Sequence, residues 1–536
     1  MAAVVSAALA LVVVPGTAAP QTPFGNVTVT TTKDGNDGEC KKDCTLREAI
    51  AVADSNAGQF VDLPPGVYKL TLGPLTLGND IVFGVGFGGN QSAGARTTVI
   101  DGRGTNRVIT VAPGASGILA GLTITGGGGV SGGGGALVPS AAQLTFYDSI
   151  IKDNAATSRG GGIQNLGNLA LFHTTVVGNR AASGAGLAAE ENSNNAIYSS
   201  TLSGNTASGN GGGIDAASSL SIQSSTIASN TAAAGGGLYQ ESTPSASTLL
   251  QNTIIGTNAG GSCGGSINGI PRNLTSHNLA ADNTCLFASA AEGTVGDPRL
   301  AGLANNGGPT DTMALGSGSP AINAADPQTC PTGSGTDQRY AAAVGVCDIG
   351  AFEFGGKPPE PTVPPPVAGK TVNVSTKSGK VLVKLPGSDE FFDLEDVQQI
   401  PVGSTIDTRK GKVTFKAAGK AKVWLYEGLF KFSQKKGKKP LTTLTLTEKL
   451  TGCKGSGKAS IAKKKVRKRR LWGDGKGRFT TKGKHSAATV VGTKWYVEDR
   501  CNGTLTVVKR GVVKVRDFKT RKTVTVRAGH KYFAKG

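Results

Sequence analysis

The sequence between residues 149 and 238 repeats itself, and this repeat decides the fold. Four segments end in asparagine: SIIKDN (149–154), TVVGN (175–179), TLSGN (201–205) and TIASN (226–230). Their final asparagines follow one another at intervals of 25, 26 and 25 residues. Glycine clusters that end in one aliphatic residue lie between them: GGGI (160–163), GAGL (184–187), GGGI (211–214) and GGGL (235–238). A fixed period of this length is typical of a solenoid in which each repeat is one coil.

Each repeat also contains stretches in which apolar and polar residues alternate, such as ALFHTTVV (170–177) and SLSIQSSTI (219–227). A period of two is typical of a β-strand. Stacked coils can bury the apolar face, because each strand then pairs with its equivalents about 4.8 Å above and below. We therefore predict a parallel β-helix over residues 64–354. Aliphatic residues would stack inside, and the repeated asparagines would occupy left-handed corners whose side-chain amides bond along the stack.

Residues 28–63 precede the regular repeats and predict a cap. Thr45 and Glu48 form a capping-box pattern at the start of a short helix. The apolar residues at helical spacing on one face are Leu46, Ala49, Ile50 and Ala53. Such a helix would cover the unpaired edge at the open end of the stack.

Composition and charge divide the chain into two parts. Gly accounts for 80 of 536 residues without a Gly-x-y period, which excludes collagen, and a helical core is disfavoured because each Gly costs a helix about 1 kcal/mol. Residues 1–356 hold 14 Lys+Arg and 23 Asp+Glu, a net charge of −9. Residues 357–536 hold 42 and 13, a net charge of +29. Opposite charges predict two domains with different partners.

The N-terminus and the cysteines predict export. Residues 1–19 contain a short apolar run before Pro15 and small residues after it, which is typical of a signal peptide. No other stretch is long and apolar enough to predict a transmembrane segment. An even number of cysteines in an exported chain indicates disulfides, paired here by proximity, although eight cysteines allow 105 connectivities. The expected pairs are Cys40/Cys44, Cys263/Cys285, Cys330/Cys347 and Cys453/Cys501.

Both ends of this first part resemble a known family. CTLREAI (44–50), with an Asp/Gly-rich run before it, resembles the CSLREA motif of bacterial surface β-helix proteins, although Thr45 stands where the family usually has Ser. Residues 296–326, TDQR (336–339) and CDIGAFE (347–353) resemble the closing segment of that group. The glycine and asparagine elements are also similar to repeats of polymorphic outer-membrane proteins. The resemblance implies an exported, right-handed parallel β-helix, usually without demonstrated catalysis.

A second, all-β domain follows a proline-rich linker. Residues 355–369, GGKPPEPTVPPPVAG, predict a semi-rigid spacer. Residues 370–536 alternate strongly, as in KVTFKAAGKAKVWLYEG (412–428), which predicts a small β-sandwich or roll with Lys and Arg facing outward. Residues 487–534 resemble a FecR-type domain. The residues that carry this resemblance are Gly492, Thr493, Trp495, Val497, Gly511, Val513, Val515, Val524, Val526, Ala528 and Gly529. It implies an extracytoplasmic β module.

The sequence gives only a weak indication of catalytic residues on the β-helix. With the coils aligned on their asparagines, Glu190, Asp215 and Glu241 follow the glycine clusters and could line one strip for catalysis or for Ca²⁺. The alternative is that they are solvated residues of a turn face. We expect no basic residue to join them, since Arg159 and Arg180 lie in the asparagine-side turns. His173 is interpreted as an outward-facing strand residue.

Two further polar groups have structural interpretations. The first is read as a clasp that closes the C-terminal end, because Arg can pair bidentately with a carboxylate; its members are Asp337, Gln338, Arg339, Asp348 and Glu353. The second, Asp34, Asn36 and Asp37, offers oxygens to Ca²⁺ without EF-hand spacing. We predict no resident cofactor or metal, and treat Ca²⁺ as the weaker alternative.

The densest charge lies in KKKVRKRR (463–470). In an exported protein it favours anionic envelope polymers or acidic polysaccharide over a specific nucleic acid, with binding that depends on salt. The alternative is a merely soluble charged loop. Trp472 could add stacking on sugar rings, whereas Trp495 is expected in the core. The candidate binding residues are Lys463, Lys464, Lys465, Arg467, Lys468, Arg469, Arg470 and Trp472.

These features predict an exported extracellular or cell-surface protein with a binding, adhesin-like or structural role and no catalysis. The first alternative is a polysaccharide lyase or glycoside hydrolase that acts on acidic polysaccharide through Glu190, Asp215 and Glu241. The second is an extracytoplasmic signalling or sensor component that acts through the FecR-like part.

Overall fold

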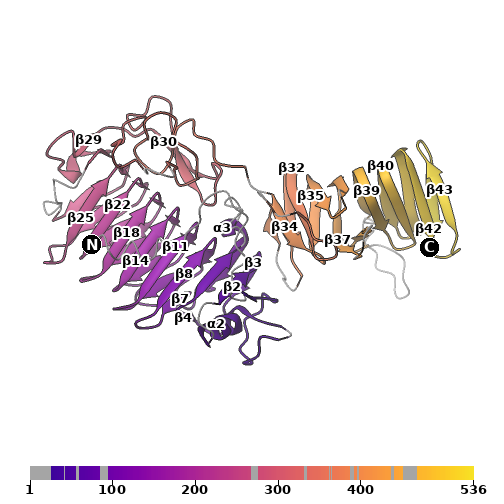
Figure 1. Cartoon of the computed structure of the whole chain (residues 1–536), viewed down its shortest axis with the longest axis horizontal. Coiled ribbons are helices and arrows are strands. Elements are labelled where there is room, and N and C mark those ends of the chain that lie inside the picture. Colours follow the sequence, from indigo (N-terminus) through magenta and orange to yellow (C-terminus); the bar gives the residue numbers. More distant parts are fainter. Residues whose placement is uncertain are drawn as a thin grey trace, which may run out of the picture. The chain divides into compact units, whose positions relative to one another are not determined.

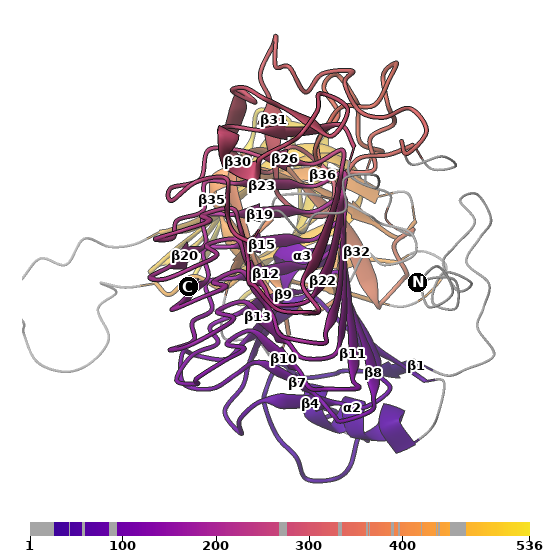
Figure 2. The ribbon, with the colours of Figure 1, turned by 90° about the vertical axis from the view of Figure 1, so that its left-hand side faces the viewer.

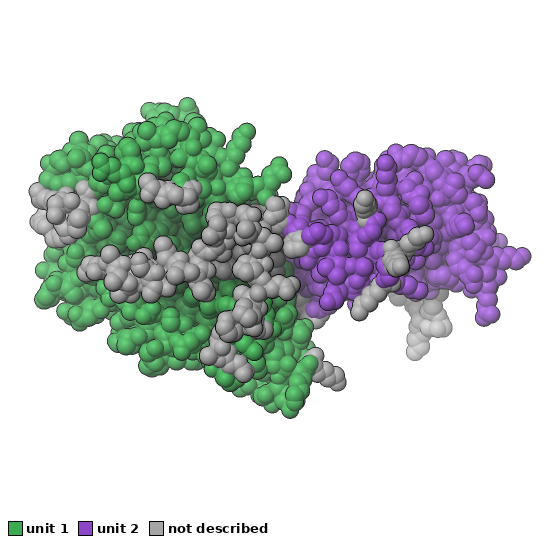
Figure 3. Space-filling model, in the orientation of Figure 1, with its two compact units in different colours: residues 1–360 green, residues 361–536 purple. Residues whose placement is uncertain are grey.

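The chain forms two compact units, residues 1–360 and residues 361–536, which Figure 3 colours separately. The boundary falls inside the proline-rich segment. This computed structural model describes residues 26–41, 43–55, 59–84, 94–266, 276–330, 335–360, 363, 365–386, 391–394, 397–419, 421–435, 437, 440–450 and 468–536. The expected signal peptide, residues 1–19, lies outside the described residues.

The first unit is the predicted parallel β-helix (Figure 1). Its described residues form three parallel sheets of nine, eight and ten strands. The first sheet contains β1 (Asn26–Thr28), β2 (Phe60–Leu63), β5 (Ile81–Gly84), β8 (Ser116–Ala120), β11 (Gln143–Tyr147), β14 (Asn168–Phe172), β18 (Asn194–Tyr198), β22 (Ser219–Gln223) and β25 (Ser247–Gln251). The second contains β4 (Leu75–Leu77), β7 (Ile109–Val111), β10 (Ala136–Val138), β13 (Ile163–Asn165), β17 (Leu187–Ala189), β21 (Ile214–Ala216), β24 (Leu238–Gln240) and β27 (Cys263–Gly265). The third contains β3 (Gly66–Lys69), β6 (Thr98–Asp101), β9 (Thr123–Thr125), β12 (Ile150–Lys152), β15 (Thr175–Val177), β19 (Thr201–Ser203), β23 (Thr226–Ala228), β26 (Ile254–Ile255), β28 (Asn278–Ala280) and β29 (Gly293–Val295).

The register places equivalent residues of successive coils on top of one another. The aliphatic residue after each glycine cluster starts a strand of the second sheet, and Ile163, Leu187, Ile214 and Leu238 pair in sequence and are buried. Figure 2 shows the strands of the third sheet stacked in the same way from β9 to β26. The predicted apolar interior is therefore confirmed.

The repeated asparagines form a continuous ladder of hydrogen bonds inside the stack. The side-chain amide of each donates to the side-chain oxygen of the next, from Asn154 to Asn179, Asn205, Asn230 and Asn258, at 2.9–3.1 Å. The same oxygen accepts from the backbone N–H of the preceding member. Four of these asparagines are buried, so the predicted bonding along the stack is confirmed.

The asparagines themselves do not adopt the left-handed conformation that we expected. The residue before each of the first four has the positive φ instead: Asp153, Gly178, Gly204 and Ser229, at 53°, 68°, 67° and 60°. Another left-handed corner lies six residues before each of these asparagines, at Asp148, His173, Ser199 and Ser224. The prediction was wrong by one position, because the corner must turn the chain before the amide can point along the stack.

A short helix caps the N-terminal coil, as predicted. Helix α2 (Leu46–Ser55) begins with the expected capping box, in which Glu48 accepts from the backbone N–H of Thr45 and Thr45 accepts from that of Glu48. The residues of its apolar face, Leu46, Ala49, Ile50 and Ala53, belong to the same buried cluster as the interior of the coils. Two more short helices are α3 (Gly94–Thr97) and the 3₁₀ helix η2 (Asn283–Cys285).

The segment expected to close the C-terminal end also lies along the side of the solenoid. It includes the antiparallel pair β30 (Leu300–Ala304) and β31 (Thr312–Leu315). The short parallel pair β16 (Arg180–Ala181) and β20 (Thr206–Ala207) does not belong to this segment and lies in the turns of the solenoid. Gln338 accepts from the hydroxyl of Thr201 at 2.6 Å and donates to that of Thr175 at 3.0 Å. Arg96 pairs with Asp311 at 2.8 Å. The segment therefore spans several coils, because threonines at the starts of successive strands present a row of hydroxyls.

Three of the expected disulfides are present: Cys40–Cys44, Cys263–Cys285 and Cys330–Cys347. Cys501 is also disulfide-bonded, and its expected partner Cys453 lies outside the described residues. Disulfides of this kind persist in oxidising compartments, which fits an extracellular protein.

The second unit is a β structure with its own core, in which every described strand pair but one is antiparallel. Its strands are β32 (Thr371–Lys384), β33 (Phe392–Asp393), β34 (Gln398–Pro401), β35 (Thr405–Ala417), β36 (Ala421–Tyr426), β37 (Leu429–Gln434), β38 (Thr442–Leu446), β39 (Arg469–Lys482), β40 (Ser486–Arg500), β41 (Gly503–Arg510), β42 (Val512–Asp517), β43 (Thr523–Arg527) and β44 (Lys531–Lys535). Register shifts interrupt the long strands β32, β39 and β40, so the two halves of each can pair with different neighbours. Its largest fully buried side chains are Trp495, Phe415, Phe430, Phe432 and Phe479.

Replacement of Asn205 by Ala should destabilise the solenoid by about 3 kcal/mol. The substitution removes the side-chain amide from the ladder and leaves buried groups of Asn179, Val176 and Asn230 without a partner, each costing about 1–3 kcal/mol before relaxation. The matched control is Asn194→Ala, because Asn194 is exposed and its side chain donates to the side chain of Asn168 on the surface. Thermal unfolding of both variants measures the effect. Equal shifts would contradict a stabilising role for the ladder.

Candidate functional site

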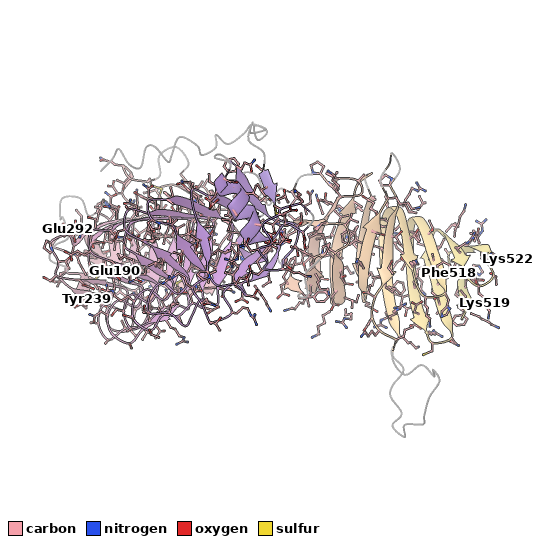
Figure 4. The ribbon with its side chains drawn as sticks, turned by 90° about the horizontal axis from the view of Figure 1, so that it is seen from below. Glu190, Tyr239, Glu292, Phe518, Lys519 and Lys522 are labelled. Atoms are coloured by element: carbon pink, nitrogen blue, oxygen red, sulfur yellow. A yellow bond between two sulfur atoms is a disulfide. The ribbon has the colours of Figure 1, made fainter. Side chains whose placement is uncertain are left out.

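The three candidate acids of the β-helix do lie together on one strip. Asp215, in β21, pairs in register with Ala188 of the coil before and Tyr239 of the coil after. Glu190 and Glu241 each follow the last residue of a strand of the same sheet, β17 and β24. Figure 4 labels Glu190 and Tyr239 on this unit. The alignment on the repeat thus placed the acids correctly.

The expectation that no basic residue joins the strip was wrong. Arg159 pairs with all three acids: its Nε lies 3.0 Å from Glu190, and its terminal nitrogen lies 3.3 Å from Asp215 and 2.8 Å from Glu241. Its backbone pairs with Ser183, in the turn before the strand of the next coil. The long side chain extends along the stack instead of across its own coil, and so it reaches acids of the three following coils.

The members of this network differ in exposure and affect one another's pKa values. The side chains of Arg159, Glu190 and Glu241 are 27%, 21% and 29% exposed, whereas Asp215 is buried. Burial raises the pKa of Asp215 to about 7, and repulsion from Glu241 and Glu190 adds to this rise, although Arg159 opposes it. Burial alone would lower the pKa of Arg159, but the three carboxylates raise it above its usual value.

This arrangement favours an ion-pair network over a reaction centre. A lyase of acidic polysaccharide needs a base beside the substrate carboxylate, and a hydrolase needs two carboxylates that face the sugar. Here Arg159 already pairs with all three carboxylates, and Gln164 also donates to Glu190 at 2.8 Å. These contacts join four successive coils, so the strip stabilises the stack in the same direction as the sheets do.

His173 occupies a covered corner rather than an outward-facing strand position. Its Nδ1 lies 3.7 Å from Asp148, and its ring packs on that of Tyr340. Burial lowers the pKa of His173 to about 4 and raises that of Asp148 to about 7, although the hydrogen bond from Tyr340 opposes the second shift. Tyr340 donates to Asp148 at 2.8 Å, so these groups hold the C-terminal segment on the solenoid.

The other polar clusters have internal partners. Asp337 accepts from Arg339, whose guanidinium lies over the Phe352 ring, and Glu353 accepts from backbone N–H groups of Val344 and Asp348. This supports the interpretation of these residues as a clasp.

The proposed Ca²⁺ oxygens are also engaged. Asp34 accepts from Arg47 and from the backbone of Thr71 and Leu72. Burial raises the pKa of Asp34, but these hydrogen bonds outweigh it and lower the pKa overall. Asp37 accepts from the backbone N–H of Glu39. Among the described residues, no group of three or more His, Cys, Asp or Glu side chains is arranged to hold a metal ion.

The candidate basic run of the second unit is described only in part, since Lys463, Lys464, Lys465 and Arg467 lie outside the described residues. The three described cations each contact an acid: Lys468 lies 3.7 Å from Glu498, Arg469 lies 2.7 Å from Asp499, and Arg470 lies 3.2 Å from Glu427. They therefore also help to hold neighbouring strands together.

The two candidate tryptophans of this unit have different positions. Trp495 is fully buried and donates to Thr481 at 2.9 Å, so its expected place in the core is confirmed. Trp472 is only partly buried and lies beside Tyr426 and Tyr496 on the opposite face of the sheet. Sequence reasoning missed both tyrosines. Alternation in 421–426 and 486–500 indicates that they face outward, but not that their strands flank β39.

No known family model and no curated protein matches this chain. The resemblances to CSLREA-motif proteins and to FecR-type domains therefore stay predictions. In the described part of the chain, no helix has the length and apolar character needed to cross a membrane.

Replacement of Arg159 by Gln should destabilise the solenoid by about 2 kcal/mol at pH 8 and by less at pH 5. When folding raises the pKa of a buried acid, the folded state becomes less stable as the pH rises from the unfolded pKa to the folded pKa. For Asp215 these two pKa values are 3.8 and about 7. Without Arg159 the folded pKa rises further, so the loss extends above pH 7. Thermal unfolding at both pH values measures this.

Adding Asp215→Asn to Arg159→Gln should recover most of the loss at pH 8. The matched control is Arg180→Gln, because Arg180 is an exposed arginine of the same turn region. A loss independent of pH, or an equal loss in the control, would contradict the network.

Proposed function

We propose that this is an exported extracellular or cell-surface protein with a binding or structural role and no catalysis. Its β-helix serves as a rigid scaffold, and its basic second unit binds anionic polymers such as acidic polysaccharide or other envelope polyanions. The parallel β-helix and the disulfides support an extracellular place, and the charge of the second unit supports the choice of partner.

The observation that carries this proposal is the excess of cations in the second unit. Residues 357–536 hold 42 Lys+Arg against 13 Asp+Glu, so pairing every acid once would still leave 29 cations. The described acids are also already engaged: Asp393 with Lys380, Asp407 with Arg409, and Asp474 with Arg510. A surface of this kind attracts polyanions and releases their counterions on binding.

The exposed cations lie in turns as well as in strands. Figure 4 labels Lys519 and Lys522 beside Phe518 in the turn between β42 and β43. All three are exposed. Charge spread over several elements favours a polymer that follows the surface over a small ligand held in one cavity.

The alternative of a polysaccharide lyase or glycoside hydrolase rests on one observation, the raised pKa of Asp215 beside Glu190 and Glu241. Raised carboxyl pKa values are common at catalytic sites, but structural ion-pair networks also produce them. The contacts of Arg159 favour the second explanation, since they occupy all three acids.

Retention of the full chain on polygalacturonate beads should fall steeply as salt rises from about 50 to 200 mM, because binding releases counterions. Neutral dextran beads serve as the control and should retain little protein at any salt concentration. Retention that does not change with salt would contradict the electrostatic proposal.

Incubation with soluble polygalacturonate tests the enzymatic alternative in the same preparation. We expect no new reducing ends or unsaturated products above those of a protein-free blank. Products formed by the natural sequence and abolished by Asp215→Asn would establish catalysis instead.

A further inference from the structure

The outer face of the second unit has a row of aromatic side chains across three adjacent strands. Tyr426 of β36, Trp472 of β39 and Tyr496 of β40 are cross-strand neighbours in one register. The Tyr426 and Trp472 ring centroids lie 5.9 Å apart with an interplanar angle of 3°, and those of Trp472 and Tyr496 lie 4.8 Å apart at 41°. Trp424, two residues before Tyr426 and on the same face, is 40% exposed.

The row is open to solvent, unlike the aromatic residues beneath it. Tyr426, Trp472 and Tyr496 are each partly exposed, whereas Trp495 on the other face of β40 is fully buried. Large aromatic rings in an antiparallel sheet ordinarily face the core. These three adjacent rings and the exposed Trp424 therefore form an unusually apolar strip on the outer face of a strongly charged unit. Such a strip is typical of an interaction surface.

Cations surround the row in an arrangement that favours an anion. Lys422 of β36 lies directly opposite Lys476 of β39, and both are exposed. Like charges directly opposite each other destabilise a sheet. An anionic partner bound between the two lysines would relieve this repulsion. Lys412 lies over the Tyr426 ring at 4.6 Å, and Lys494 and Arg510 outnumber the one acid they share, Asp474.

We propose that this face, formed by Trp424, Tyr426, Trp472 and Tyr496 with Lys422 and Lys476, is a subsite for an anionic polysaccharide. The proposal rests on the function proposed above and names the surface that carries it. The apolar C–H faces of sugar rings stack on aromatic faces, whose electron density is negative, and the acid groups of the polymer pair with the lysines. Adjacent strands lie about 4.8 Å apart, so the three rings span a short run of sugars.

Single-stranded nucleic acid is the competing ligand class, because bases also stack on aromatic rings beside cations. Two observations favour the polysaccharide. The disulfides indicate an oxidising compartment, where acidic polysaccharides are abundant. The rings of Tyr426 and Trp472 are also parallel and stacked, and the centroid separations of 5.9 Å and 4.8 Å along the row leave no room for a base between neighbouring rings.

The tryptophans provide a direct readout on the full chain. The chain has three, of which Trp424 and Trp472 lie on this face and Trp495 is buried. Quenching by neutral acrylamide should therefore report mainly on the face. Addition of a galacturonate hexamer at about 50 mM salt should reduce this quenching, and a neutral glucose oligomer of the same length should not.

Variants separate stacking from charge. Trp472→Leu should weaken hexamer binding about tenfold without changing the salt dependence, and Trp424→Ser, at an exposed position, should weaken it by a smaller factor. Lys422→Gln with Lys476→Gln should also weaken binding and should lower the salt dependence by about two ions. The matched control, Lys519→Gln with Lys522→Gln, removes the same charge from the β42–β43 turn, which belongs to the wider cationic surface and not to the row, and should weaken hexamer binding less than the first pair does.

The outcomes distinguish this subsite from the wider proposal. Salt-dependent retention on polygalacturonate beads, with unchanged quenching and unchanged affinity in Trp472→Leu and Trp424→Ser, would overturn the subsite and leave the proposed function standing. Absence of retention at low salt would overturn the proposed function itself. A thymidine oligonucleotide that binds more tightly than the hexamer and depends on Trp472 would identify a nucleic-acid platform and overturn the polysaccharide. Should Trp472→Leu not fold, Trp424→Ser and the quenching measurement decide.

Discussion

The ladder of asparagine amides is the interaction on which the first unit depends. Parallel strands alone fix the spacing between coils but leave the turns free, and turns rich in glycine lose much conformational entropy when they become ordered. The ladder from Asn154 to Asn258 fixes the turns, because each amide satisfies backbone and side-chain groups of the neighbouring coils. Removal of one member exposes the partners on both sides, so stability is shared along the stack rather than held within one repeat.

The same repeat that aligns the asparagines also aligns the other polar side chains. Arg159 meets acids of three following coils, and threonines at the starts of β15, β19 and β23 bind the C-terminal segment through Gln338 and Ala351. In each case a column of equivalent positions becomes a line of partners along the axis. These two polar columns of the solenoid are thus occupied by internal contacts, whereas the aromatic row of the second unit is open to solvent.

Much of the first unit could be predicted because its information is local and repeated. The capping box of Thr45 and Glu48 and the buried column of Ile163 and Leu187 follow from spacing within one repeat. The left-handed corner was misplaced by one residue, since spacing cannot show which of two neighbours turns the chain. Arg159 was missed because its partners depend on the direction of a long side chain. The row of Tyr426, Trp472 and Tyr496 was missed because β36 and β39 are neighbours in the sheet but not in the sequence.

The central claim is that the solenoid is a scaffold and that binding takes place on the cationic, aromatic face of the second unit. Hydrogen–deuterium exchange of the full chain, with and without a galacturonate hexamer, tests it most directly. Protection confined to peptides that cover β36, β39 and β40 would support the claim. Protection of the strip that contains Glu190, Asp215 and Glu241, with none on those strands, would contradict it.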